Sequence, residues 1–238
     1  MNLSAHELGF KALNEIIRST NEDVVIDHCF GERFIGSGAV SKTITIHGTP
    51  GNALGAYLDG ATIIVNGNVQ DAVGDTMNDV KIIINGNAGD VLGYAMRGGK
   101  IFVKGNAGYR TGIHMKEYKD KKPLIVVGGT VGSFLGEYLA GGMIIVLGLE
   151  SVDCPVGNFT GTGMHGGEIF IRSSKKPEYL PEQVCVSIAD DSDIRSIKAY
   201  LYEFSELFGF SMDDILNKPF YRLTPNAKNP YKQLYTFN

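Results

Sequence analysis

The chain has 238 residues, of which 43% are hydrophobic and 20% are charged, so it is long enough to bury a core and has a composition ordinary for a globular protein. The formal net charge is −4, and the one basic run that stands out is residues 116–122, which disfavours nucleic acid and anionic membranes as partners. Glycine is unusually frequent, with 31 residues, and this requires either low complexity or a backbone that turns sharply many times.

The lack of a recognisable targeting signal and the usage of cysteine favour the cytoplasm. No stretch approaches 18 consecutive apolar residues, and the amino terminus lacks the pattern of a signal peptide. The three cysteines, Cys29, Cys154 and Cys185, are odd in number and far apart, which favours free thiols over a disulfide framework or a metal site. We therefore expect a cytoplasmic protein.

Residues 1–30 are predicted to form an amino-terminal helix and a capping strand. Ser4 and Glu7 have the spacing of a capping box. An amphipathic stripe follows them, formed by Leu8, Ala12, Leu13, Ile16 and Ile17. A short strand is expected at 24–27. Such a segment would cover the exposed strand edge of the repeat that comes next.

A glycine-punctuated repeat fills the middle of the chain. Apolar runs that end in glycine begin at residues 43, 62, 81 and 100, each 19 residues after the one before, and three further runs follow at 123–128, 143–148 and 168–172. A marker glycine recurs with them, at Gly36, Gly55, Gly74, Gly93, Gly112, Gly136 and Gly161. The last two steps are 24 and 25 residues, so insertions are expected near 116–122 and within 149–156.

This period predicts an all-β fold, a single-stranded parallel β-helix of about 7 coils over residues 31–190. A unit of 19 residues with one β-branched run is too short for a helical repeat or a propeller blade. It suits one coil of a β-helix, in which residues one period apart stack directly. At each corner, the glycine supplies a positive φ.

Stacked columns follow from the period. Two apolar columns are predicted to point inward: Ile64, Ile83, Phe102, Val126, Ile145 and Phe170, and Leu58, Met77, Met96, Met115, Leu139 and Met164. Asn68, Asn87 and Asn106 are expected to form an amide ladder. A polar column is assigned to an outer turn: Asp59, Asn78, Arg97 and Lys116.

Residues 191–238 are predicted to form carboxy-terminal helices and a tail. A short run at 184–188 precedes a helix that ends at Gly209, with an apolar stripe of Ile194, Ile197, Leu201, Phe204 and Phe208. The acidic residues Asp190, Asp191 and Asp193 suit the start of that helix, and Ser211 is expected to cap a further short helix that ends before Pro219. The tail carries Phe220, Tyr221, Tyr231, Tyr235 and Phe237, which pack either on the chain itself or on a partner.

No catalytic, cofactor-binding or metal-binding residue is assigned. The glycine loops at 86–93 and 128–136 resemble phosphate loops, yet the pattern recurs in every coil. His28, Cys29 and His165 have no companions at ligand spacing. A hexapeptide-type acyltransferase is an alternative, with His114 as the histidine to check, although a period of 19 is not a multiple of six.

The segments EYLAGGMIIVLG (137–148) and VGNFTGTGMHGG (156–167) resemble the GXGXG domain at the carboxy terminus of the glutamate synthase large subunit. The resemblance begins at 33–36 and ends, more loosely, at 219–234. It implies a right-handed β-helix, which the helices predicted at both ends of the chain would cap. It also implies a stand-alone, non-catalytic subunit that holds a glutamine amidotransferase and an FMN- and iron–sulfur-bearing synthase together, with both cofactors on the partners.

The same repeat is shared with other complexes, and the sequence leaves these open. The β-helix subunits of N-methylglutamate synthase and formylmethanofuran dehydrogenase are similar to it. A homo-oligomer also remains open.

Overall fold

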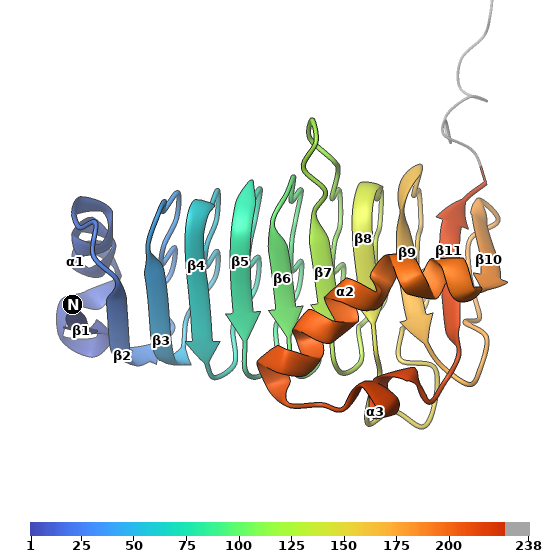
Figure 1. The fold of residues 1–238 in the computed structure, drawn as a ribbon. Helices are drawn as coiled ribbons and strands as arrows, with labels where there is room; N and C mark the ends of the chain where they lie inside the picture. Colours follow the sequence, from blue (N-terminus) through green and yellow to red (C-terminus); the bar gives the residue numbers. More distant parts are fainter. Residues whose placement is uncertain (227–238) are drawn as a thin grey trace, which may run out of the picture.

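The computed structural model describes residues 1–226, which form one long, mostly parallel β-sheet with few helices, a β-helix-like fold (Figure 1). The sheet has 11 strands in the order β1-β2-β3-β4-β5-β6-β7-β8-β9-β11-β10. The strands are β1 (Asn2–Ser4), β2 (Val24–Phe30), β3 (Thr43–Thr49), β4 (Asp59–Asn66), β5 (Asp79–Ile84), β6 (Lys100–Val103), β7 (Leu124–Val127), β8 (Ala140–Val146), β9 (Gly166–Arg172), β10 (Val184–Ile188) and β11 (Phe220–Pro225). The helices are α1 (Ala5–Ser19), α2 (Asp191–Phe208) and α3 (Met212–Leu216). No helix among these is long and apolar enough to cross a membrane.

The predicted period sets the strand register. Ile44 pairs with Ile63, Ile63 with Ile82 and Ile82 with Ile101, each 19 residues on, and the next partner is Ile125 across the first insertion. The corners stack in the same way, because the N–H of Gly74 donates to Leu54 O at 2.9 Å and that of Gly93 donates to Val73 O at 2.8 Å. Each coil is thus hydrogen-bonded to its neighbours on more than one wall.

One predicted inward column is confirmed. The Leu58, Met77, Met96, Met115, Leu139 and Met164 side chains are all completely buried in the main core. They pack there with strand residues such as Ile63, Ile82 and Ile101.

The prediction that the other column points inward was wrong. Phe102, Val126, Ile145 and Phe170 are buried, but they belong to a second cluster with residues of α2. Successive strand residues point to opposite faces, so neighbours of the inward-facing Ile101 must point outward. The helix lies across the outer face of the later strands, whereas Ile64, on β4, is only half-buried (Figure 1).

The amino-terminal helix forms without the predicted capping box. Ser4 occupies the N-cap position of α1, but its side chain makes no capping hydrogen bond. Ser4 is also the last residue of β1 and pairs with Asp27 in the parallel β1–β2 ladder, which the sequence did not reveal. Gly9, at a φ of 66°, interrupts the helix. The strand predicted at 24–27 is confirmed and extends to Phe30.

The carboxy-terminal helix begins and ends where the sequence indicates. Asp190 caps α2 in a reciprocal capping box with Asp193, and Gly209 ends it in the left-handed conformation at a φ of 74°. Ser211 caps α3, accepting a hydrogen bond from the Asp214 N–H at 3.0 Å.

The prediction that helices cap the carboxy-terminal end of the stack was wrong. α2 packs on the outward apolar column and therefore lies on the side of the sheet. At the end of the stack, β11 and β10 continue the sheet in place of a helix (Figure 1). β11 inserts antiparallel between β9 and β10 and carries Phe220 and Tyr221. Of the predicted tail aromatics, Tyr231, Tyr235 and Phe237 lie outside the described residues.

Candidate docking surface

The first predicted insertion is a short hairpin that projects from the stack between β6 and β7 (Figure 1). Within residues 116–122, here called the basic hairpin, Tyr118 and Lys121 pair in antiparallel fashion. The Tyr118 N–H donates to Lys121 O at 3.2 Å, and the Lys121 N–H donates back to Tyr118 O at 3.1 Å. The turn residue Lys119 has a φ of 59°. The insertion is therefore an ordered element.

The base of the basic hairpin is anchored to the coils on both sides. Lys121 Nζ lies 2.8 Å from an Asp79 carboxylate oxygen, and the Gly142 N–H donates to Glu117 Oε1 at 3.2 Å. Hydrogen bonds from Lys121 and from the Val80 N–H lower the pKa of Asp79, so this carboxyl stays ionised. A Cβ on Gly141 would lie 2.7 Å from the Glu117 backbone nitrogen, so that glycine leaves the space for the hairpin.

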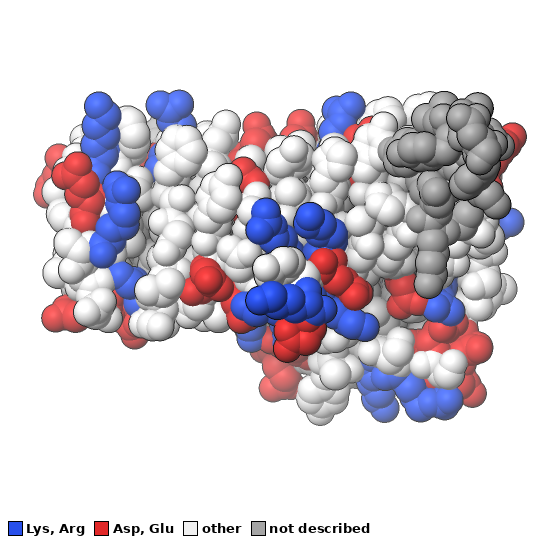
Figure 2. Space-filling model, turned by 90° about the horizontal axis from the view of Figure 1, so that it is seen from above, with Lys and Arg blue, Asp and Glu red and all other residues white. Residues whose placement is uncertain are grey.

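The basic hairpin as a whole is locally positive. Residues 116–122 contain four lysines and two carboxylates, on a chain whose net charge is −4. Lys119 and Lys122 are exposed, and Lys119 Nζ lies over the Tyr118 ring, 5.3 Å from its centroid. In the face seen from above, basic side chains gather over the middle of the molecule, with acidic side chains among them (Figure 2).

A groove of about 670 Å³ runs beside the basic hairpin. Its lining comes from the hairpin, β8, β9, α2 and β11, and includes Lys122, Pro123, Met143, His165, Tyr200 and Pro225. The carboxylate of Glu168 in this lining is already paired, because the Arg222 guanidinium contacts it and also lies 3.1 Å from Asp193. These two carboxylates help to raise the pKa of Arg222, Glu168 more strongly through its hydrogen bond. What remains open is a surface of apolar side chains bordered by Lys122 and Glu117 of the hairpin.

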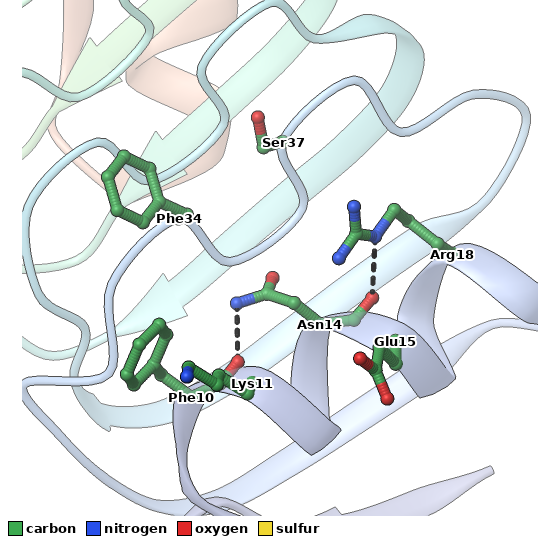
Figure 3. A pocket seen from close by; sticks show the side chains of 7 residues that line it. All are labelled: Phe10, Lys11, Asn14, Glu15, Arg18, Phe34 and Ser37. Carbon is green, nitrogen blue, oxygen red and sulfur yellow. Dashed lines mark hydrogen bonds between the residues drawn. The ribbon is translucent and has the colours of Figure 1, made fainter.

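A second pocket, of about 310 Å³, lies between α1 and the first coil (Figure 3). Its lining consists of Phe10, Lys11, Asn14, Glu15, Arg18, Phe34 and Ser37. The Asn14 amide is nearly buried and donates to Phe10 O at 2.7 Å and to Arg33 O at 2.9 Å. Arg18 Nε donates to Asn14 O at 3.2 Å. These polar groups join the helix to the solenoid, which is a structural role.

Of the histidines and cysteines singled out in the sequence, His28 and Cys29 line one pocket with His6 and Glu7, whereas His114 and His165 lie elsewhere. His114 stacks on Tyr138, with ring centroids 5.0 Å apart, and contacts Tyr94 edge-to-face at 5.9 Å. Burial raises the pKa of the Cys29 thiol to about 12, and a hydrogen bond and the negative charge of Glu32 add to the effect, so the reactive thiolate is suppressed. Within residues 1–226 there is no group of three or more His, Cys, Asp or Glu side chains that could hold a metal ion.

The predicted amide ladder is present, with one change in its chemistry. The Asn87 and Asn106 backbone N–H groups each donate, at 2.8 Å, to the side-chain oxygen of the asparagine one coil earlier. A direct amide–amide bond joins Asn87 to Asn68 at 3.3 Å. A parallel ladder through Asn52, Asp71 and Asp90 was missed, although it shows the same 19-residue spacing. Both ladders satisfy backbone donors of the outer turns.

Comparisons with known proteins agree with this fold. The model of the GXGXG motif family matches residues 13–226. An uncharacterised protein of Methanocaldococcus jannaschii is 41% identical over 249 residues, which covers 98% of this chain and 95% of that protein. The chain also resembles a crystal structure of the formyltransferase/hydrolase complex of Methylorubrum extorquens in complex with methylofuran, with a TM-score of 0.62 and 22% identity. That likeness covers 77% of this chain and 67% of the other and concerns the fold alone.

Proposed function

The chain belongs to the GXGXG motif family, and from this premise we propose that it is a non-catalytic scaffold subunit of a multi-subunit enzyme complex. The observation that supports the proposal is the unbroken stacking of coils from β3 to β9, hydrogen-bonded through strands and corners. At about 4.8 Å per coil, this stack extends over roughly 30 Å. A stiff body of that length holds two catalytic units at a fixed separation, so a small intermediate passes between them with little loss.

Two complexes are candidates for this role. The motif resemblance supports a glutamate synthase-type complex, in which a glutamine amidotransferase and an FMN- and iron–sulfur-bearing synthase would be the partners. The likeness of fold supports a formyl-transfer complex more directly, because the similar solved structure is itself a formyltransferase/hydrolase complex. In both cases the cofactors would belong to the partners. The motif resemblance also implies right-handed coils. The proposal further includes a division at about residues 30 and 190, taken from the limits of the repeat, and a cytoplasmic location, taken from the cysteine usage.

Purification of the tagged chain from its native host tests the proposal. We expect partner subunits in fixed stoichiometry, which mass spectrometry would identify as either an amidotransferase with a flavin synthase or formyl-transfer subunits. Recombined with the purified chain, the partners should couple their reactions better than they do without it, as measured by glutamine-dependent glutamate formation or by formyl transfer. A wild-type chain that elutes alone, or that turns over substrate by itself, would contradict a scaffold role.

A further inference from the structure

We propose that the basic hairpin and the groove beside it form the docking surface for an acidic, partly apolar face of a partner subunit. This inference rests on the proposed scaffold function, because the partner is a protein of the same complex. It specifies which part of the solenoid the partner meets and which chemistry that partner presents.

The hairpin is fixed to the neighbouring coils by hydrogen bonds and an ion pair. The step from Gly112 to Gly136 contains five residues more than the regular period, and these close a hydrogen-bonded hairpin. Lys121 binds Asp79 of the coil two turns earlier, and Glu117 binds the backbone of Gly142 in the following coil. A solvated loop needs no such fixation on both sides, whereas a recognition element gains from it, because less conformational entropy is lost on binding.

The charges of the hairpin are divided between anchoring and presentation. Lys121 is engaged with Asp79 and, at 3.8 Å, with Asp59. Lys116, Lys119 and Lys122 are exposed and form no ion pair within residues 1–226, and the carboxylate of Asp120 at the turn is exposed as well. These three ammonium groups outnumber the Asp120 carboxylate on the projecting element, so on a chain of net charge −4 they attract an acidic surface at long range and fix its orientation.

The groove adds the apolar component of the interface. Pro123, Met143 and Pro225 line it together with Lys122 and with Tyr200 of α2. An apolar centre bordered by charges is the usual arrangement of protein–protein interfaces. A nucleic acid fits less well, because its phosphate backbone has no apolar surface to place against Pro123, Met143 and Pro225, and the whole chain is acidic.

A double charge reversal, Lys119→Glu with Lys122→Glu, tests the surface. The matched control is Lys11→Glu with Lys176→Glu, which changes the net charge equally at two exposed lysines elsewhere. In titrations with the co-purified partner, we expect the hairpin variant to bind about tenfold more weakly at low salt, with the difference shrinking toward about 0.5 M salt. The control should bind as the wild type does. Equal affinity of the wild type and the hairpin variant would overturn the proposal.

A second measurement keeps the two proposals separate. If the wild-type chain retains no partner, the scaffold function fails, and the surface is judged by binding of an oligoglutamate peptide to the isotopically labelled chain. Amide shifts at 116–124 that disappear in the hairpin variant would support the surface, and their absence would overturn it. Tighter binding of duplex DNA or anionic vesicles would also overturn it. The proposal would also be overturned if the wild-type chain formed a dimer that the hairpin variant did not form. Peptide binding that appeared only after removal of residues 227–238 would overturn it as well.

Discussion

At the scale of single residues, the corner glycines determine whether one coil can lie on the next. All seven marker glycines have a φ between 64° and 76°. A Cβ on Gly74 would lie 2.6 Å from Ile101 Cδ1, and one on Gly93 would lie 2.5 Å from Ile125 Cδ1. The chain holds Val91 at a φ of 52°, so the fold tolerates backbone strain alone. At Gly55, Gly74, Gly93, Gly112 and Gly136, a side chain would therefore have to displace the inward isoleucine in addition to adopting the strained backbone.

Gly93→Val should lower the free energy of unfolding by about 2–4 kcal/mol, because it combines strain with this collision. Gly38→Val is the matched control, since Gly38 has a φ of 66° but no atom within 4 Å of the added Cβ. Ser133→Val, away from the corner, should cost about 1 kcal/mol through its lost hydrogen bond to the Asn158 N–H. Denaturant unfolding would measure all three, and equal losses at Gly93 and Gly38 would contradict the steric argument.

The ion pairs of Glu203 predict a pH dependence. Burial alone would raise the pKa of Glu203, but hydrogen bonds and charges from Lys100 and Lys81 outweigh it and lower the pKa. A lowered pKa in the folded state gives stability that is present above the ordinary carboxyl pKa and is lost as the pH falls through the folded value. Between about pH 6 and pH 3, Glu203→Gln should therefore lose less stability than the wild type. Glu206→Gln, an exposed change on the same helix, should follow the wild type in urea titrations.

At the scale of elements, β11 joins the end of the stack to the helices. It pairs with β9 on one side and β10 on the other, with Leu223 opposite Ile169. The buried Arg172 side chain of β9 donates to Ile215 O and Asp214 O of α3, both at 2.8 Å, and burial lowers the pKa of its guanidinium. These bonds hold the turn that leads into β11.

Two truncations should separate β11 from the residues beyond it. Deletion of 220–238 removes a strand that lies between two others and leaves the backbone donors of β9 and β10 unpaired, so the melting temperature should fall by about 10 °C or more. Deletion of 227–238 keeps the whole of β11, and we expect a shift within about 2 °C. A large shift in the shorter deletion would show that the terminal aromatics contribute to this domain. Thermal unfolding followed by circular dichroism measures both.

At the scale of the whole molecule, the stack should tolerate an added coil. Contacts in a solenoid are made between neighbouring repeats, so stability is approximately additive along it. A second copy of residues 43–61, inserted after Ala61, keeps every column in register. The protein should then remain folded and lengthen by about 4.8 Å, as small-angle scattering would show. An insertion of residues 43–52 alone shifts the later columns by half a coil. That variant should unfold at a markedly lower temperature, and equal stability of the two would contradict the register.

The sequence by itself determined the repeat. The 19-residue spacing of Gly36 to Gly112 predicted the strand register, the corner positions and the Leu58-to-Met164 core column, because stacked coils require the same residue type at the same phase. Gly209, Asp190 and Ser211 likewise predicted helix ends, since caps are local interactions. The insertion at 116–122 was visible as a break in the spacing, although its hairpin was not.

Only the tertiary structure decided which way a column faces and what covers it. Alternation along a strand shows that Ile101 and Phe102 point to opposite sides, but both are apolar, and the sequence cannot tell the core from a face covered by α2. The insertion of β11 between β9 and β10, the pairing of Ser4 in β1 and the groove beside the basic hairpin depend on segments far apart in sequence. Such contacts carry no periodic signal, because each occurs once, at the place where the repeat ends or is interrupted.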